Sequence, residues 1–216
     1  MPRAARSWTS FFDPVLGWVY PQRCALCARI GFPTICDLCF ADFSRIGDPV
    51  PVGAGPIRSR ASLFLYTGRA AQAVQRLKYE RATSLIEPMA RMVAEYAGSH
   101  GLDQVDAIVP VPIHWRRRWM RGFNQAEMLC AGLDARLLDV GGLVRVRATK
   151  PQVGLNPTER GQNLQGAFRA RRRFDGQNVL LVDDVSTSGH TMTECARTLV
   201  EAGAERVSAL SFCSAT

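Results

Sequence analysis

Residues Val179 to Thr191 read Val-Leu-Leu-Val-Asp-Asp-Val-Ser-Thr-Ser-Gly-His-Thr. The first four residues are apolar without alternation, which is typical of a strand buried on both faces of a parallel sheet. Two adjacent carboxylates, Asp183 and Asp184, follow at the expected carboxyl end of this strand, where ligands collect in open α/β sheets. From Thr191 onward apolar residues recur at helical spacing until Gly203, so the sequence predicts a strand, a loop and a helix.

The loop from Thr187 to Thr191 therefore forms the N-terminus of a helix. Free N–H groups and the positive end of the helix dipole favour a phosphate there, and Gly189 permits its close approach. The two preceding carboxylates can accept hydrogen bonds from vicinal sugar hydroxyls, so this order of parts predicts a sugar-phosphate site. A Walker B strand or a surface turn is the alternative. The chain lacks the Gly-x-x-x-x-Gly-Lys-Ser/Thr loop that the Walker reading requires.

The same stretch resembles the ribose-phosphate motif of type I phosphoribosyltransferases, in which two acids precede a Thr-Thr-Gly-x-Thr loop. The resemblance implies that Asp183 and Asp184 are the catalytic residues. It also implies a substrate-binding loop of seven residues: Val185, Ser186, Thr187, Ser188, Gly189, His190 and Thr191. Purine-base enzymes of that superfamily carry an acid where this loop has threonine. A hydroxyl cannot accept a proton near neutral pH, so purine salvage is disfavoured. The histidine is expected to face solvent.

Length and composition fit a compact unit with a small appendage, since 216 residues with 47% hydrophobic content can bury one sizeable core. The formal net charge of +8 favours anionic partners such as a nucleotide, pyrophosphate or DNA. No apolar run approaches the roughly 18 residues of a membrane helix, so no integral membrane segment is expected. Residues 7–20 are expected to form an amphipathic element packed on the rest, with a membrane-touching role as the alternative.

Four of the seven cysteines form two Cys-x-x-Cys pairs, Cys24 with Cys27 and Cys36 with Cys39. Four thiolates at this spacing predict a closed, structural zinc site, with an iron–sulfur cluster or disulfides as alternatives. The odd cysteine total and the lack of a secretory signal favour a reducing compartment, so we expect a cytoplasmic protein. The other three cysteines are expected in the core: Cys130, Cys195 and Cys213.

Prolines and glycines in Gly47–Gly55 predict a linker, which divides the chain into residues 1–50, with the amphipathic lead-in and zinc ribbon, and residues 57–216. The second part has the order expected of an α/β domain, a mostly parallel sheet flanked by helices. Strands are expected at Ala61–Tyr66, Val105–Val111, Leu143–Arg147, Val179–Val182 and Val207–Phe212, and helices at Ala70–Tyr79, Leu85–Ala97 and Phe123–Leu138.

The segment Ile113–Gln125 places four arginines after the second strand, at what we expect to be a strand-to-helix turn. Guanidinium groups on the same sheet edge as the acids can clamp a departing pyrophosphate, with Arg118 and Arg121 as the preferred donors. A solvated basic face or a patch for nucleic-acid phosphates is the alternative. Residues Thr149 to Gly166 lack an apolar period and are expected to form either a lid that brings in Arg160 or an exposed connection.

Several blocks in order, from about Tyr20 to the end, resemble the ComF family of competence-associated, phosphoribosyltransferase-like proteins. They are the paired Cys-x-x-Cys element, Leu77-Lys78-Tyr79, Pro110-Val111-Pro112, Arg121-Gly122-Phe123-Asn124-Gln125, the Gln152 and Arg160–Asn163 block closing on Phe168, and the acidic loop. The resemblance implies an N-terminal zinc ribbon and a site for phosphoribosyl diphosphate with Lys78 and Arg160 among its contacts.

A mechanism follows in which substrate-carried Mg²⁺ and the arginines stabilise departing pyrophosphate while an oxocarbenium-like carbon forms, as in a phosphoribosyltransferase. The family also implies a link to the uptake of single-stranded DNA. Two alternatives keep the fold and remove the catalysis. The first is a nucleotide-regulated or single-stranded-DNA-binding module of the uptake machinery, and the second is a scaffold that contacts a DNA-uptake helicase through the zinc ribbon.

Overall fold

The computed structural model describes residues 22–32, 34–147 and 164–215. Its central strands are β1 Val50–Pro51, β2 Ser59–Leu65, β3 Ala107–Pro110, β6 Asn178–Ser186 and β7 Arg206–Ser214. They form one sheet in the order β1-β2-β7-β6-β3, in which β1 is antiparallel to β2 and the other four strands run parallel. The expected α/β class with a mostly parallel sheet is therefore confirmed.

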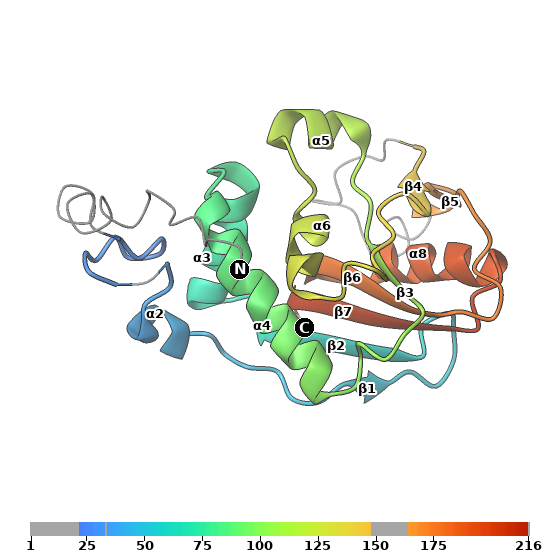
Figure 1. The fold of residues 1–216 in the computed structure, drawn as a ribbon, viewed down its shortest axis with the longest axis horizontal. Helices are drawn as coiled ribbons and strands as arrows, with labels where there is room; N and C mark the ends of the chain where they lie inside the picture. The colour runs from blue at the N-terminus through green and yellow to red at the C-terminus, as the bar shows by residue number, and fades with distance from the viewer. Residues whose placement is uncertain (1–21, 33, 148–163, 216) are drawn as a thin grey trace, which may run out of the picture.

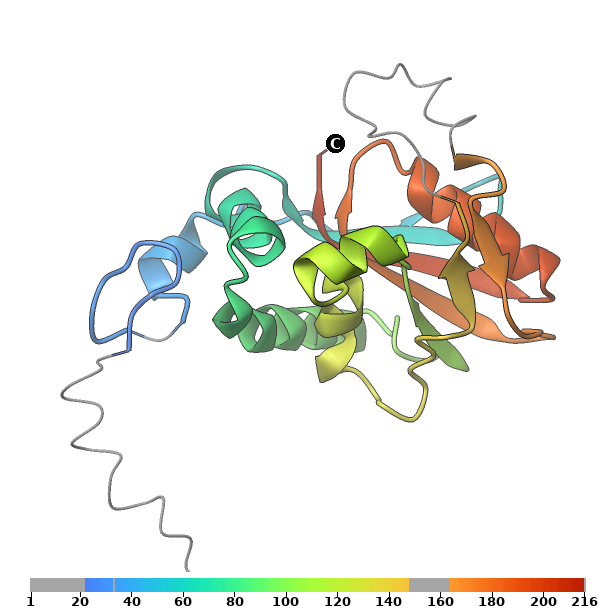
Figure 2. The same cartoon turned by 90° about the horizontal axis from the view of Figure 1, so that it is seen from above.

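Helices cover both faces of this sheet (Figures 1 and 2). Helices α3 Gly68–Tyr79 and α4 Ile86–Ser99 lie on one face, and α8 His190–Glu201 lies on the other beside a hairpin of β4 Leu143–Arg145 and β5 Phe168–Ala170. Shorter elements complete the described chain: α2 Asp37–Ala41, η2 Thr83–Leu85, α5 Trp115–Arg121, α6 Gln125–Leu129 and η3 Cys130–Gly132.

The apolar run of β6 is explained by this two-sided cover. Leu180 and Val182 point into the cluster beneath α3 and α4, whereas Val179 and Leu181 point into the cluster beneath α8. All four side chains are buried. Because neither face of the strand meets water, no polar residue alternates with the apolar ones.

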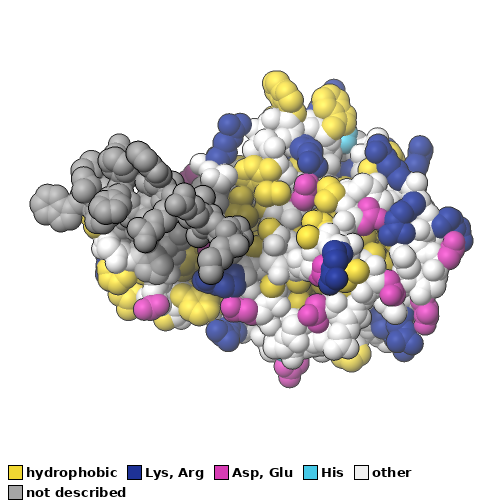
Figure 3. Space-filling model, viewed as in Figure 1, with side chains coloured by type: hydrophobic (Ala, Val, Ile, Leu, Met, Phe, Trp, Pro, Cys, Tyr) yellow, Lys and Arg dark blue, Asp and Glu magenta, His cyan; other side chains and the backbone are white. Residues whose placement is uncertain are grey.

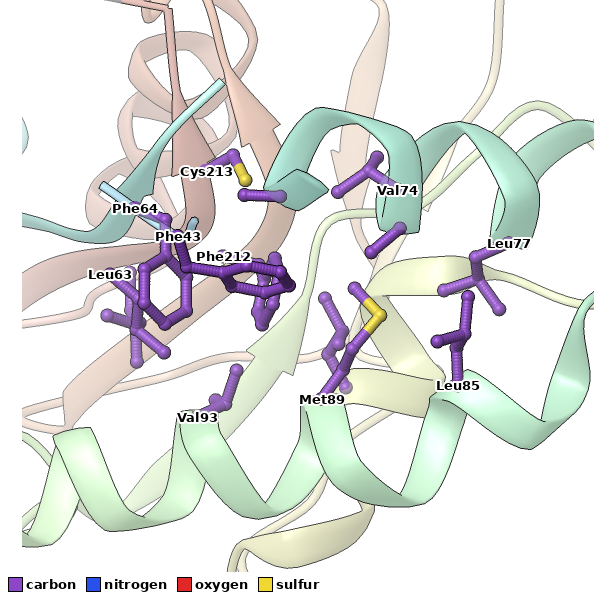
Figure 4. Close-up of a cluster of buried hydrophobic side chains, with 14 of the residues drawn as sticks. Phe43, Leu63, Phe64, Val74, Leu77, Leu85, Met89, Val93, Phe212 and Cys213 are labelled. Carbon is purple, nitrogen blue, oxygen red and sulfur yellow. The ribbon is translucent and has the colours of Figure 1, made fainter. Parts of the chain in front are cut away.

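The core beneath α3 and α4 also holds the N-terminal element in place. Phe43, just after α2, packs edge-on against Phe64 of β2 with ring centroids 5.0 Å apart, and Phe64 packs in turn against Phe212 of β7 at 5.3 Å. Figure 4 shows these rings converging with apolar side chains of α3 and α4, including Met89. Edge-to-face aromatic contacts of this kind favour one fixed arrangement of the elements that carry them.

The helix expected over Phe123–Leu138 is wrong in its second half. Helix α6 ends at Leu129 and the chain turns through η3, where Gly132 approaches α4 so closely that a Cβ there would lie 2.7 Å from the Ala90 carbonyl oxygen. Asp134 then accepts a hydrogen bond from the Arg136 backbone N–H at 2.9 Å, a local bond that competes with helix. The apolar period of this stretch predicted the buried face correctly but not the helix.

The strand expected at Leu143–Arg147 is shorter and does not belong to the central sheet. It forms β4 and pairs antiparallel with β5. The outer edge of β3 is already occupied, because the backbone N–H of Ile108 donates to Leu137 and that of Asp139 donates to Ile108. With no free hydrogen-bonding edge available there, the later segment pairs elsewhere.

The segment Gly47–Gly55, expected to be a linker, contributes β1 to the sheet edge. Within the described ranges no helix is long and apolar enough to cross a membrane. Two expectations lie outside the described residues, namely the amphipathic element at 7–20 and most of the Thr149–Gly166 segment with Arg160.

Candidate functional site

We expected the two acids to follow the end of the strand, but they lie within β6, which continues to Ser186. The pairing of β3 with β6 stops at Pro110 and Val182, so the last residues of β6 pair with β7 alone and border an opening above β3. Successive residues of a strand point to opposite faces. Asp184 accordingly points toward α3, whereas Asp183 points toward the α8 side, and both line the same cleft.

Asp184 is paired with Lys78, from the last turn of α3, through a 2.8 Å contact between Oδ1 and Nζ. The carboxylate is buried, and the lysine is largely so. Burial acts to lower the pKa of Lys78, but Asp184 and then Asp183 outweigh it, so the pKa is raised and the ammonium stays charged. Lys78, which we expected to contact the substrate, thus contacts Asp184 directly.

Asp183 has the most perturbed carboxyl group of the site. Burial, followed by repulsion from Asp184, raises its pKa to about 8, and Lys78 only partly offsets this. Its Oδ1 accepts a hydrogen bond from the backbone N–H of Asp184 at 2.8 Å. Near neutral pH the Asp183 carboxyl therefore keeps its proton and can donate as well as accept a hydrogen bond.

The small-residue loop follows directly and leads into α8. Gly189 is the residue before the helix and has φ of +72°, a left-handed conformation that glycine adopts at little cost. As a glycine, this N-cap residue has no side chain to cap the helix. The loop therefore leads into a helix N-terminus, the kind of position that favours an anion, as expected for a phosphate loop. His190 is half-exposed, and its Nδ1 lies 2.6 Å from the Ser188 hydroxyl.

A cleft of about 770 Å³ joins these parts. The acids and the loop residues Thr187 and Thr191 lie on one side. The basic side chains that line it are Lys78, Arg81, Arg117, Arg121 and Arg145, and the aromatic ones are Tyr66 and Tyr79. The remaining lining comes from Val111, Pro112, Ile113, Met120, Asn124 and Val185. A volume of this size accommodates a sugar carrying phosphate groups.

The arginine segment forms α5, and its members are distributed differently from the expectation. Arg121 lines the cleft, donates from Nη1 to Gln125 Oε1 at 3.0 Å and lies over the Tyr79 ring. Arg118, expected to be a second donor, is not part of the lining and instead forms a 3.0 Å ion pair with Glu127. Arg117, one residue earlier in α5, lines the cleft instead.

Sequence reasoning missed Arg145, which reaches the cleft from β4. It lies over the Phe168 ring of the neighbouring strand, and burial lowers its pKa, followed by repulsion from Arg117. An isolated arginine in a short strand gives no motif, so only the folded hairpin brings it to the acids. Asn124 also lines the cleft and holds the turn together, because its amide donates to the Val111 carbonyl and its Oδ1 caps α6.

The four clustered cysteines are brought together at the N-terminal element. Their sulfur atoms all lie within 4.8 Å of one another, and those of Cys27 and Cys36 are 3.7 Å apart. Four thiolates bound tetrahedrally at about 2.3 Å from one ion lie about 3.8 Å apart, so the donor set fits a metal with little movement. The backbone N–H of Cys36 also donates to the Cys24 sulfur at 3.4 Å, which helps to orient that ligand.

Comparisons with known proteins give the domain type and the relatives of this chain. The family model for the phosphoribosyl transferase domain matches residues 121–215. DNA utilization protein YhgH of Salmonella typhi is 34% identical in an alignment that covers 99% of this chain and 93% of the relative. Competence protein F of Haemophilus influenzae is 36% identical over 62% of this chain and 63% of its own. Competence protein ComFC of Bacillus subtilis is 27% identical over 83% of this chain and 72% of its own.

Proposed function

The chain belongs to the ComF family of phosphoribosyltransferase-like proteins, and on that basis we propose that its cleft binds phosphoribosyl diphosphate or a related ribose phosphate. One observation carries the proposal. Asp183 and Asp184 share a single cleft with Thr187 and Thr191 of the phosphate loop. Carboxylates that can accept hydrogen bonds from the ribose hydroxyls therefore lie near loop groups that can donate to the phosphate, so one pentose phosphate can reach both.

In the proposed complex the loop from Thr187 to Thr191 holds the 5′-phosphate by its N–H and hydroxyl groups, and the acids hold the ribose hydroxyls. Asp184 accepts from one hydroxyl while Lys78 maintains its charge. Asp183, protonated near neutral pH, donates to a ribose oxygen. The substrate-carried Mg²⁺ supplies positive charge at the pyrophosphate. Arg121 and Arg117 lie across the cleft, where guanidinium groups stabilise the same anion.

We further propose that the protein is a phosphoribosyltransferase. Positive charge develops at the anomeric carbon as the bond to pyrophosphate breaks, and the Asp184 carboxylate in the same cleft favours that carbon. The cations on α5 and β4 favour the departing pyrophosphate. Thr187 offers no proton acceptor for a purine, so the acceptor is expected to be another nucleophile.

Isothermal titration calorimetry with phosphoribosyl diphosphate and Mg²⁺ tests the binding step. Asp184→Asn removes a charged acceptor and is expected to weaken binding about tenfold or more. Asp103→Asn makes the same change in an exposed loop at the opposite edge of the sheet and is expected to bind like the parent. Equal affinity of the Asp184 variant and the parent contradicts the assignment. Release of pyrophosphate in a panel of acceptors then tests the transferase.

We propose that the cysteine cluster holds a structural zinc ion, that residues 1–50 comprise an amphipathic lead-in and the zinc ribbon, and that residues 57–216 form the phosphoribosyltransferase-like domain. The proposal rests on four thiols in one cluster, with no other donor group contributing among the described residues, and a site with four protein ligands leaves no open position for chemistry. Because such thiols stay reduced and metal-bound in the cytoplasm, that compartment is the proposed location. Metal analysis by mass spectrometry is expected to find about one zinc per chain.

A second candidate function, binding of single-stranded DNA for its uptake, is favoured by the surface of α5. Trp115 and Trp119 are 65% and 84% exposed on a helix that contains four arginines and no acid. Figure 3 shows hydrophobic and basic side chains together over this helix. Bases stack on exposed aromatic rings, and guanidinium groups bind the phosphates between them.

The anisotropy of a fluorescent oligodeoxynucleotide measures this binding. Trp119→Ala is expected to weaken it by about 1–3 kcal/mol, the contribution of one stacked base, without changing the salt dependence. Arg116→Gln is expected to make the salt dependence shallower, because one phosphate contact is lost. If neither variant changes the affinity, α5 does not contact DNA. Strong binding together with no pyrophosphate release favours the non-catalytic role, in which a DNA-uptake helicase is a further proposed partner.

A further inference from the structure

A second hollow, of about 350 Å³, lies behind the phosphate loop at the carboxyl edge of the same sheet. Its floor is formed by β2 and β7, and its far side by Asp48 and Val50 near β1. Ser188 and Gly189 form the wall shared with the loop. The acid pair is not among its lining residues, so this hollow is separate from the cleft that holds Asp183 and Asp184.

The floor of the hollow is polar although it belongs to the middle of a parallel sheet. Ser62 and Ser211 are register partners on β2 and β7, and their hydroxyl oxygens lie 2.6 Å apart. Ala209, on the same face two residues earlier, belongs to the apolar cluster beneath α8. The sheet face thus changes from apolar to hydroxyl-bearing between Ala209 and Ser211. Ser211 is buried and Ser62 is partly exposed, and hydroxyl groups suit a bound ligand with acceptor oxygens.

Arg60 supplies the positive charge of the hollow. Its Nη2 donates to the Thr193 hydroxyl at 2.7 Å, and its guanidinium lies directly against Gly189. Among the described residues no protein acceptor binds the Nε or Nη1 group, and the side chain is half-buried. Burial lowers the pKa of this arginine, and a nearby anion would offset that cost.

Asp48, the acid in the lining, does not neutralise this site. Its side chain is 93% exposed, and its Oδ1 lies 3.3 Å from Nε2 of His100, the residue after α4. The carboxylate is therefore directed to solvent and α4, whereas Arg60 lies against the loop at the other side of the hollow. The interior offers one cation and several hydroxyls, a set of donors matched to a small, tetrahedral oxyanion.

We propose that this hollow is a second anion site, which binds the phosphate group of a small ligand between Arg60 and the serine hydroxyls of the floor. The size favours a small molecule, because 350 Å³ lies at the lower end of the range for small-ligand pockets. Thr187 lines both the cleft and the hollow, so the two phosphate sites are neighbours across the loop. Thr193 links them further, since it accepts from Arg60 and donates to the Gly189 carbonyl at 3.0 Å.

Equilibrium dialysis with radiolabelled inorganic phosphate tests the proposal by counting sites. The parent chain is expected to bind phosphate at both places, and Arg60→Met is expected to lose one site or weaken it at least about tenfold. Arg58→Met removes the same charge two residues away from an exposed arginine outside the lining and serves as the matched control. Unchanged phosphate binding by the Arg60 variant overturns the proposal.

The outcomes separate this site from the ribose-phosphate cleft. If the parent binds one phosphate and Arg60→Met abolishes it, the second site stands and the proposed first one fails. If that single phosphate survives the substitution, the second site is refuted.

Because Arg60 also contacts Thr193 of α8, its substitution could weaken binding through a folding defect, and a second variant controls for this. The double change Ser62→Ala and Ser211→Ala leaves the arginine in place and removes the floor hydroxyls. It is expected to weaken the same site about tenfold, and full affinity in this well-folded variant again refutes the site.

Discussion

Asp183→Asn offers the most direct test of the electrostatics of the site, because an amide keeps the shape of the carboxyl group and removes its proton. In the folded parent the pKa of Asp183 is about 8, above its ordinary value of 3.8. Between these two values the folded chain holds a proton that the unfolded chain has lost. The contribution of this group to stability is therefore fully present below about pH 4 and is lost as the pH rises through 8.

The magnitude follows from the linkage. Each pH unit within that window lowers the free energy of unfolding of the parent by about 1.4 kcal/mol through this group, and the amide variant is free of the effect. The stability of Asp183→Asn relative to the parent is thus expected to rise by about 2.7 kcal/mol between pH 5 and pH 7.

Urea denaturation followed by circular dichroism at pH 5, 6 and 7 measures the difference. Asp175→Asn is the matched control. A hydrogen bond from Arg173 holds the pKa of Asp175 below its ordinary value, so this carboxyl is ionised throughout the range and its substitution is expected to give no slope. If the difference in free energy of unfolding between the Asp183 variant and the parent stays constant with pH, Asp183 is not protonated in the folded chain and cannot have the donor role proposed for it.

Three further substitutions test other parts of the structure. Lys78→Met leaves the buried carboxylate of Asp184 without its partner and is expected to lower the free energy of unfolding by about 3–5 kcal/mol at pH 7, measured in urea. Cys39→Ser removes one of the four sulfur donors and is expected to abolish stoichiometric zinc by mass spectrometry and to lower the melting temperature; retention of a full zinc complement contradicts the site. Gly132→Ala places a methyl group against the Ala90 carbonyl and is expected to cost about 1–3 kcal/mol; a neutral effect shows that α4 yields there.

The order of the motifs along the chain predicts most of the fold class and the phosphate loop. The unbroken apolar run before Asp183 indicated a strand covered on both faces, and Gly189 indicated a tight entry into a helix; the structure has both. The spacing of the cysteines alone predicted one cluster of four sulfur atoms, and the structure has it. These features are local, since each depends on residues close together in the chain, and local periodicity and turn chemistry report them directly.

Other features depend on contacts between distant segments. The helix expected through Leu138 ends early because Gly132 packs on α4, some 40 positions earlier in the chain. The choice of Arg117 over Arg118 depends on the rotation of α5, and Arg145 reaches the acids only because β4 pairs with β5. The spacing of residues within one segment cannot predict these contacts with distant segments.

The sequence by itself determined that two acids, a phosphate loop and a cysteine cluster exist, because each is a short pattern with its own chemistry. Only the tertiary structure decided the electrostatics of the acids, by partly burying Asp183, which raises its pKa, and by placing Lys78 of α3 against Asp184. The protonation of a carboxyl group depends on the dielectric and the charges around it. Those surroundings come from elements that lie about a hundred residues apart in the chain and meet only when the sheet forms.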